Sequence, residues 1–166
     1  MTHETLHQLL TPTGTDALAA AADLKPTDVS YPAAFDRLRK RYPADLARAA
    51  LDQTLLRSKA AGKFAAAARM LFTRDAYEMA SGDATANHRA KRFAPYARVA
   101  DLCCGLGADA LALAAAGRDV VAIDRDPVMV ALTRANLDAA GLPGRAVVGD
   151  ALTFDQIGRA SCRERV

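Results

Sequence analysis

The chain of 166 residues has few cysteines, few aromatic side chains and no long apolar run. Its three cysteines are too few for a disulfide framework, and Cys103 and Cys104 are adjacent, so they cannot chelate one metal ion as a C-x-x-C pair does. No apolar stretch approaches the roughly 18 residues of a membrane span, and no basic segment leads into an apolar one at the N-terminus. These absences predict a cytoplasmic protein without membrane anchor or metal, in which Cys103 and Cys104 are small buried residues.

The last residues of the chain, 156–166, follow neither a helical nor a strand period. Within them, residues 157–166 resemble the reading-frame translation of a short-read sequencing adapter, so we interpret this tail as an artefact and exclude it from the fold. We expect the native protein to be longer and to diverge near residue 155. The tail contributes two of the three units of formal net charge, and the remainder is too small to indicate a nucleic-acid partner by itself.

The first 93 residues are rich in alanine, leucine and basic side chains and poor in β-branched residues. We therefore expect a helical region, with helices at residues 16–23, 33–41, 43–63, 74–80 and 83–93, and with Thr73 and Ser81 as N-caps. Basic side chains are frequent here and have little aromatic interleaving: Arg37, Arg39, Lys40, Arg41, Arg48, Arg57, Lys59, Lys63, Arg69, Arg74, Arg89, Lys91 and Arg92. A solvated helical surface explains such a cluster, and a phosphate-binding face for RNA is the alternative.

One motif near the N-terminus matches a zinc-protease helix. His3, Glu4 and His7 form H-E-x-x-H, in which two imidazoles one helical turn apart would face a metal. A catalytic zinc site needs a third protein ligand and a closed surround, whereas a chain terminus is expected to fray. We therefore predict no metal site here.

Three short apolar runs in the second half of the chain each end in an aspartate: Asp101, Asp124 and Asp150. The pattern predicts strands at residues 98–104, 119–124 and 145–149, joined by helices at 108–116 and 127–140. Gly117 and Gly141 stand where a left-handed residue closes a helix, and Asp126 is a candidate N-cap. Alternating strands and helices predict a parallel sheet, so the three aspartates should lie at the sheet edge where ligands bind.

A glycine turn follows the first of these strands. Gly105 and Gly107 permit positive φ and close ligand approach, where a larger side chain would occupy the ligand's volume. Residues 105–110 also satisfy the dinucleotide fingerprint G-x-G-x-x-G/A, with Asp124 about 20 residues further on as a candidate ribose-binding acid. However, a pyrophosphate gains nothing from the carboxylate of Asp101 before the glycines, whereas a cationic ligand does. S-adenosylmethionine, with its ammonium and sulfonium, suits this turn better than NAD.

The segment from Asp101 to Gly107 resembles the D-x-x-x-G-x-G signature of class I S-adenosylmethionine-dependent methyltransferases. The resemblance covers roughly residues 90–155 and implies that Gly105 and Gly107 line the methionine end. It further implies that Asp101 holds the ammonium, Asp124 the ribose hydroxyls and Asp150 the adenine amino group. We also take three neighbours as cofactor contacts: Cys103, Arg125 and Ala151.

The resemblance implies a Rossmann-like α/β methyltransferase fold, of which the chain contains the first three parallel strands. We divide the chain into an all-α N-terminal region (1–93), the N-terminal half of the cofactor-binding domain (94–155) and the tail (156–166). The helical segment also resembles a bacterial methyltransferase group with a C-terminal THUMP-like domain, and THUMP domains elsewhere bind RNA. The outer edge of the first strand should be open, which predicts poor folding or aggregation.

The methyl acceptor is unidentified, and RNA is one possibility. The resemblance places the catalytic residues downstream of residue 155, so we expect the chain alone to be inactive. Two alternatives stay open: an NAD-dependent oxidoreductase, and a non-catalytic RNA-binding module.

Overall fold

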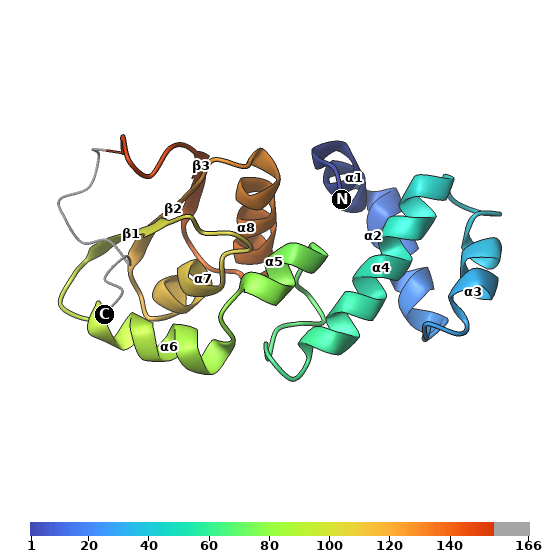
Figure 1. Cartoon of the computed structure of the whole chain (residues 1–166), viewed down its shortest axis with the longest axis horizontal. Coiled ribbons are helices and arrows are strands. Elements are labelled where there is room, and N and C mark those ends of the chain that lie inside the picture. Colours follow the sequence, from blue (N-terminus) through green and yellow to red (C-terminus); the bar gives the residue numbers. More distant parts are fainter. Residues whose placement is uncertain (155–166) are drawn as a thin grey trace.

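The computed structural model describes residues 1–154, and the predicted artefactual tail lies outside them. A helical region comes first, followed by alternating strands and helices (Figure 1). The helical region comprises α1 (His3–Leu9), α2 (Pro12–Asp23), α3 (Tyr31–Leu38), α4 (Ala44–Ala60), α5 (Arg74–Met79) and α6 (Asp83–Arg92). The second part comprises β1 (Arg98–Leu102), α7 (Ala108–Ala115), β2 (Asp119–Asp124), α8 (Pro127–Ala140) and β3 (Arg145–Val148).

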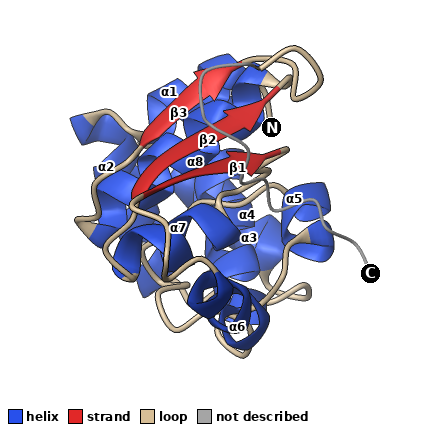
Figure 2. Cartoon of the chain, turned by 90° about the vertical axis from the view of Figure 1, so that its left-hand side faces the viewer, coloured by secondary structure: helices blue, strands red, loops and turns tan. Residues whose placement is uncertain are grey.

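The strands form one parallel sheet in the order β1-β2-β3, as predicted. Figure 2 shows the three strands side by side, with helices behind them. Val99 is in register with Val120, and Ala122 with Ala146. Parallel neighbours joined through α7 and α8 give the expected Rossmann-like α/β fold. Among residues 1–154, β1 pairs with no strand besides β2.

The sheet buries side chains on both faces by strict alternation along the strands. Val99, Val120 and Ala122 lie on the face covered by α7 and α8, where Leu113 and Leu137 complete a buried cluster. The other face carries a second cluster: Ala100, Val121 and Ile123, with Phe154 packed against them. Burial on both faces explains why the strands read as continuous apolar runs.

The helical region has its own core, built largely from alanine. Ala17 and Ala21 of α2 and Ala47 and Ala50 of α4 are all fully buried, so these two helices approach closely. The N-terminal helix α1 contacts α2, α4 and α8, and its Leu6 is buried. The expectation that this terminus frays is therefore wrong, because α1 bridges the helical region and the sheet's covering layer.

Several element boundaries differ from the sequence expectation. The first strand ends at Leu102 rather than at residue 104, because Cys103 has a left-handed backbone with φ 62°. The N-cap of α6 is Gly82 instead of Ser81, and α4 ends at Ala60 instead of residue 63. The helix predicted at 16–23 begins at Pro12, with Thr11 as its N-cap.

Other local predictions are confirmed. Thr73 caps α5 through a hydrogen bond from the Ala76 amide, and Asp126 caps α8 by accepting from Val128. Gly141 is left-handed at the end of α8. No helix within residues 1–154 combines the length and apolar character that crossing a membrane would require.

Candidate functional site

The glycine turn, residues 104–107, connects β1 to α7 and is held at each of its peptide groups. The amide of Gly105 donates to Asp124 Oδ2 at 3.0 Å, and the carbonyl of Gly105 accepts from Thr133 Oγ1 at 2.9 Å. The carbonyl of Leu106 accepts from Asn136 Nδ2 at 2.9 Å. The amide of Gly107 donates to the Cys104 carbonyl at 2.9 Å. Side chains from β2 and α8 thus fix a loop whose sequence is intrinsically mobile.

The two glycines of the turn are needed for different reasons. Both are left-handed, with φ 58° at Gly105 and 88° at Gly107. A Cβ added to Gly105 would meet nothing within 4 Å, so open space lies in front of that backbone. A Cβ on Gly107 would lie 2.9 Å from Thr133 Cγ2. Gly107 therefore serves the close packing of the turn against α8, and its expected place at the methionine end of the cofactor stays a prediction.

Asp101 lies at the carboxyl end of β1, beneath the turn, and is 4% exposed. Its Oδ2 is the one buried side-chain nitrogen or oxygen without a hydrogen-bond partner in the part of the chain that the structure describes. Burial, followed by the charge of Asp109, raises the pKa of Asp101 to about 7. A buried carboxylate oxygen without a partner is costly unless a donor or cation reaches it.

A salt bridge beside Asp101 joins the helical region to the first turn of α7. Arg89 of α6 donates from Nε to Asp109 Oδ1 at 2.8 Å and from Nη2 to Oδ2 at 2.7 Å. The same Nη2 also donates to Ser81 Oγ. Ser81, expected as an N-cap, therefore contributes to this contact instead.

A cavity of about 280 Å³ opens at the ends of β2 and β3. Five of the predicted site residues line it: Cys103, Asp124, Arg125, Asp150 and Ala151. Ile123, Gly149 and Leu152, which the sequence interpretation did not include, complete the lining. Asp101, Gly105 and Gly107 lie outside it, at the neighbouring strand end. The structure thus distributes the predicted residues over two adjoining places at one sheet edge.

The aspartates of this cavity also support their own loops. Asp124 Oδ1 accepts from the amide of Asp126 at 3.0 Å, and Asp150 Oδ1 accepts from Leu152 at 2.9 Å. A carboxylate has about four acceptor positions, so these bonds leave capacity for ligand hydroxyl or amino groups. The local capping role and a binding role are therefore compatible at both positions.

The adjacent cysteines have opposite environments. Cys104 is buried, and desolvation raises its thiol pKa to about 12, so it is unreactive at neutral pH. Cys103 is exposed and lines the strand-end cavity, which corrects the expectation that both cysteines are buried. The left-handed backbone at Cys103 turns its side chain out of the strand's alternation.

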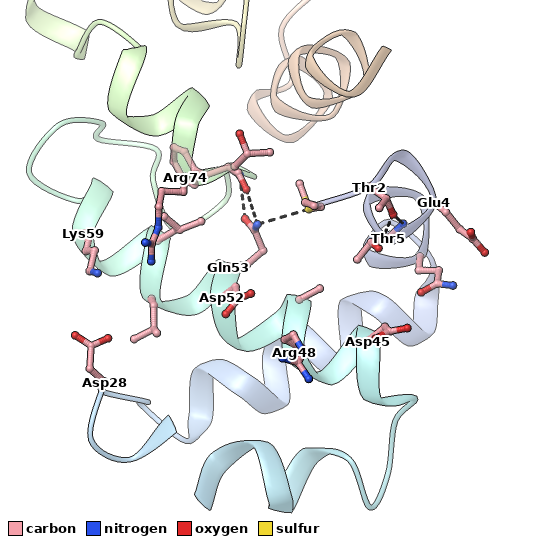
Figure 3. A pocket seen from close by; sticks show the side chains of 17 residues that line it. Thr2, Glu4, Thr5, Asp28, Asp45, Arg48, Asp52, Gln53, Lys59 and Arg74 are labelled. Atoms are coloured by element: carbon pink, nitrogen blue, oxygen red, sulfur yellow. Dashed lines mark hydrogen bonds between the residues drawn. The ribbon is translucent and has the colours of Figure 1, made fainter. Parts of the chain in front are cut away.

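A larger cavity, of about 790 Å³, lies in the helical region between α1, α4 and the start of α5 (Figure 3). Its charged lining mixes both signs: Glu4, Asp28, Asp45 and Asp52 with Arg48, Lys59 and Arg74. It contains none of the predicted cofactor residues. We place the candidate site at the smaller cavity and the neighbouring end of β1, because the carboxyl ends of the parallel strands meet there. The left-handed glycine turn and the unpartnered Asp101 oxygen lie at that neighbouring strand end.

The H-E-x-x-H residues form part of α1, and the rings of His3 and His7 stack edge to face with centroids 5.4 Å apart. Within residues 1–154, no group of three or more histidine, cysteine or acidic side chains is arranged to hold a metal ion.

Besides Ile123, Gly149 and Leu152, three residues that hold the turn were not identified from the sequence: Leu106, Thr133 and Asn136. Thr133 and Asn136 are fully buried polar residues three apart on α8. Polar side chains at helical spacing within an apolar helix were the available signal, since buried polar groups are almost always hydrogen-bonded to a specific partner.

The fold and the strand-end site together define a Rossmann-like α/β domain with a candidate ligand site at the carboxyl ends of its strands. Residues 99–161 match the family described as a methyltransferase domain, and residues 2–60 match a domain of unknown function (DUF8688). The methyltransferase match extends into the tail that the sequence interpretation treats as artefact.

Two relatives and one solved structure are similar to parts of this chain. Two proteins of Mycobacterium tuberculosis, from strains H37Rv and CDC 1551, are described as uncharacterized S-adenosylmethionine-dependent methyltransferases. Each is 35% identical over 121 residues, covering 69% of this chain and 33% of the relative. A crystal structure of a candidate methyltransferase from Porphyromonas gingivalis W83 matches with a TM-score of 0.64 at 22% identity, covering 82% of this chain and 36% of that one. The chain thus spans about a third of the length of these proteins.

Proposed function

We propose that this chain is the S-adenosylmethionine-binding part of a methyltransferase. The observation that carries the proposal is the Oδ2 atom of Asp101, buried without a partner beneath a left-handed glycine turn. A cationic group delivered to this oxygen would offset the cost of burying the carboxylate. The ammonium of the cofactor's methionine part has the required charge.

The remaining residues suit the other parts of the same ligand. The open space in front of Gly105 lets a ligand pass close to the backbone. Asp124 would accept from the ribose hydroxyls, and Asp150 from the adenine amino group, with Cys103, Arg125 and Ala151 around them in the cavity. The bound cofactor would supply an electrophilic methyl group on its sulfonium. The chain's own residues bind, orient and partly desolvate that ligand.

Calorimetric titration with S-adenosylmethionine, S-adenosylhomocysteine and NAD tests this proposal against an oxidoreductase. We expect the chain to bind S-adenosylmethionine and S-adenosylhomocysteine, and we expect Asp124→Ala to abolish this binding. We expect no binding of NAD, because its pyrophosphate would lie near the carboxylate of Asp101. Binding of NAD alone would support the oxidoreductase instead.

We expect the chain to bind cofactor without transferring a methyl group. The resemblance to the methyltransferase family places acceptor-positioning residues beyond residue 155, and the chain spans only a third of its relatives. Methyl transfer to any acceptor by the purified 166-residue chain would contradict this expectation.

RNA as the acceptor, in a protein of the group with a THUMP-like domain, is supported by the basic helical region alone. Six of its basic side chains have structural partners: Arg39, Arg41, Arg48, Arg57, Lys63 and Arg89. The others are exposed: Arg37, Lys40, Lys59, Arg69, Arg74, Lys91 and Arg92. RNA binding that weakens with salt, and weakens further when Arg69 and Arg74 become alanine, would support RNA as the partner. RNA binding without any cofactor affinity would instead support the non-catalytic module.

A further inference from the structure

A fully buried asparagine on α8 joins the helical region to the glycine turn. Asn136 is 1% exposed. Its Nδ2 donates to the Leu106 carbonyl at 2.9 Å and to the Leu71 carbonyl at 3.1 Å, and its Oδ1 accepts from the Leu71 amide at 2.7 Å. One side chain therefore satisfies both backbone groups of Leu71, in the segment before α5, and one carbonyl of the turn.

The side chain of Leu106 is held by the same part of the molecule. It is 1% exposed and packs in a cluster with Phe64, Phe72 and Ala76 of the helical region. Leu106 stands between the two left-handed glycines, so its carbonyl and its side chain determine how the turn lies over β1. Both anchors lead back to the segment around residues 64–76.

We propose that Asn136 is a positioning residue, through which the packing of the helical region fixes the glycine turn in the conformation that binds cofactor. The inference rests on the proposed function. Glycines on both sides of Leu106 give the free turn many conformations. The apparent dissociation constant equals the intrinsic one divided by the fraction of molecules whose turn has the binding conformation. Releasing the Leu106 carbonyl lowers this fraction and therefore weakens binding, although Asn136 makes no contact with the ligand.

The chain offers a matched control in Gln53 of α4. Gln53 is 2% exposed, and its side-chain amide pairs with the backbone of Phe72, next to Leu71, at 2.6 and 2.9 Å. Gln53 thus supports the same segment with the same chemistry but forms no hydrogen bond to the turn. A purely structural role for Asn136 would make the two substitutions equivalent.

The experiment compares Asn136→Leu with Gln53→Met in the 166-residue chain. Thermal unfolding gives the midpoint of each variant, and calorimetry with S-adenosylhomocysteine, well below both midpoints, gives the dissociation constant. We expect the unfolding midpoints of both variants to fall. In Asn136→Leu the dissociation constant should rise about tenfold, which corresponds to a fall in the fraction of molecules with a competent turn to about a tenth. In Gln53→Met, which disturbs Phe72 beside Leu106 but keeps the Leu106 carbonyl bonded to Asn136, the dissociation constant should rise much less.

Hydrogen exchange of the Gly105 and Gly107 amides provides a readout that needs no cofactor. We expect faster exchange in Asn136→Leu than in Gln53→Met. Should Asn136→Leu fail to fold, Leu106→Ala, which removes the apolar anchor and keeps every hydrogen bond of the turn, should give the same pattern. Equal affinities and equal exchange in the test and control variants would overturn the positioning role. Failure of the wild-type chain to bind cofactor would contradict the proposed function, while the exchange comparison would still decide the role of Asn136.

Discussion

Replacing Asp101 with asparagine should stabilise the cofactor-free protein at neutral and alkaline pH while impairing its ligand binding. Burial raises the pKa of Asp101 from 3.8 to about 7, which corresponds to a free energy on the order of 4 kcal/mol against the ionised form. In the folded chain the carboxyl holds its proton up to about pH 7, whereas the unfolded chain releases it near pH 4. The folded state therefore binds more protons between these values, and stability falls as the pH rises through this window.

Asparagine has nearly the same shape and carries no charge, so Asp101→Asn should lack this decline. Urea unfolding at several pH values from 4 to 8 measures the difference. We expect the two proteins to differ little at pH 4, and the variant to be more stable at pH 8 by up to about 4 kcal/mol. Asp119→Asn is the control. Asp119 is 53% exposed in its salt bridge with Arg98, so its charge should contribute little to the free energy of unfolding.

The same variant should bind S-adenosylmethionine about 10- to 100-fold more weakly, because a hydrogen bond to a charged group contributes about 1.5–3 kcal/mol. Parallel stability curves for wild type and Asp101→Asn would refute the reasoning about burial. A more stable variant with unchanged cofactor affinity would refute the binding role of Asp101 alone.

Further predictions concern the turn and the cysteines. Gly105→Ala should lower the free energy of unfolding by about 1 kcal/mol, because the added Cβ meets no atom and only the left-handed backbone disfavours alanine. The same substitution should weaken cofactor binding measured by calorimetry. Gly107→Ala should destabilise more than Gly105→Ala because its Cβ would press on Thr133, and the opposite order would contradict the packing assigned to Gly107. Iodoacetamide at pH 8 should label Cys103 and spare the buried Cys104, as peptide mass spectrometry of the Cys103→Ser and Cys104→Ser variants would show. Cofactor should protect Cys103, and unchanged labelling in its presence would remove Cys103 from the site.

The strand and helix pattern of the second half could be predicted because its signals are local. The alternation of apolar runs with turn residues located β2 and α8 at their observed ends, and Asp126 and Gly141 marked the limits of α8 through backbone chemistry of their own. The end of β1 was placed too late because Cys103 adopts a left-handed backbone, which the type of residue does not suggest.

Contacts between distant segments could not be predicted in the same way. The bond between Asn136 and Leu71 joins residues 65 apart, and nothing in the local sequence of either indicates the other. The dual use of Asp124, which holds the Gly105 amide as well as facing the cavity, also depends on how two strands lie in the sheet. The candidate residues were thus found by type and position, whereas the network that fixes their geometry required the fold.

The same network explains why the helical region and the sheet should be treated as one folding unit around the site. Leu106 is buried by side chains that precede β1 in the chain, and Arg89 of α6 binds Asp109 in the first turn of α7. Asp109 in turn raises the pKa of Asp101, the residue proposed to meet the ligand's ammonium. A change in the packing of the helical region would therefore reach the candidate site by two routes: residues 64–76 act on the position of the turn, and Arg89 of α6 acts on the charge of Asp109 beside the buried carboxylate.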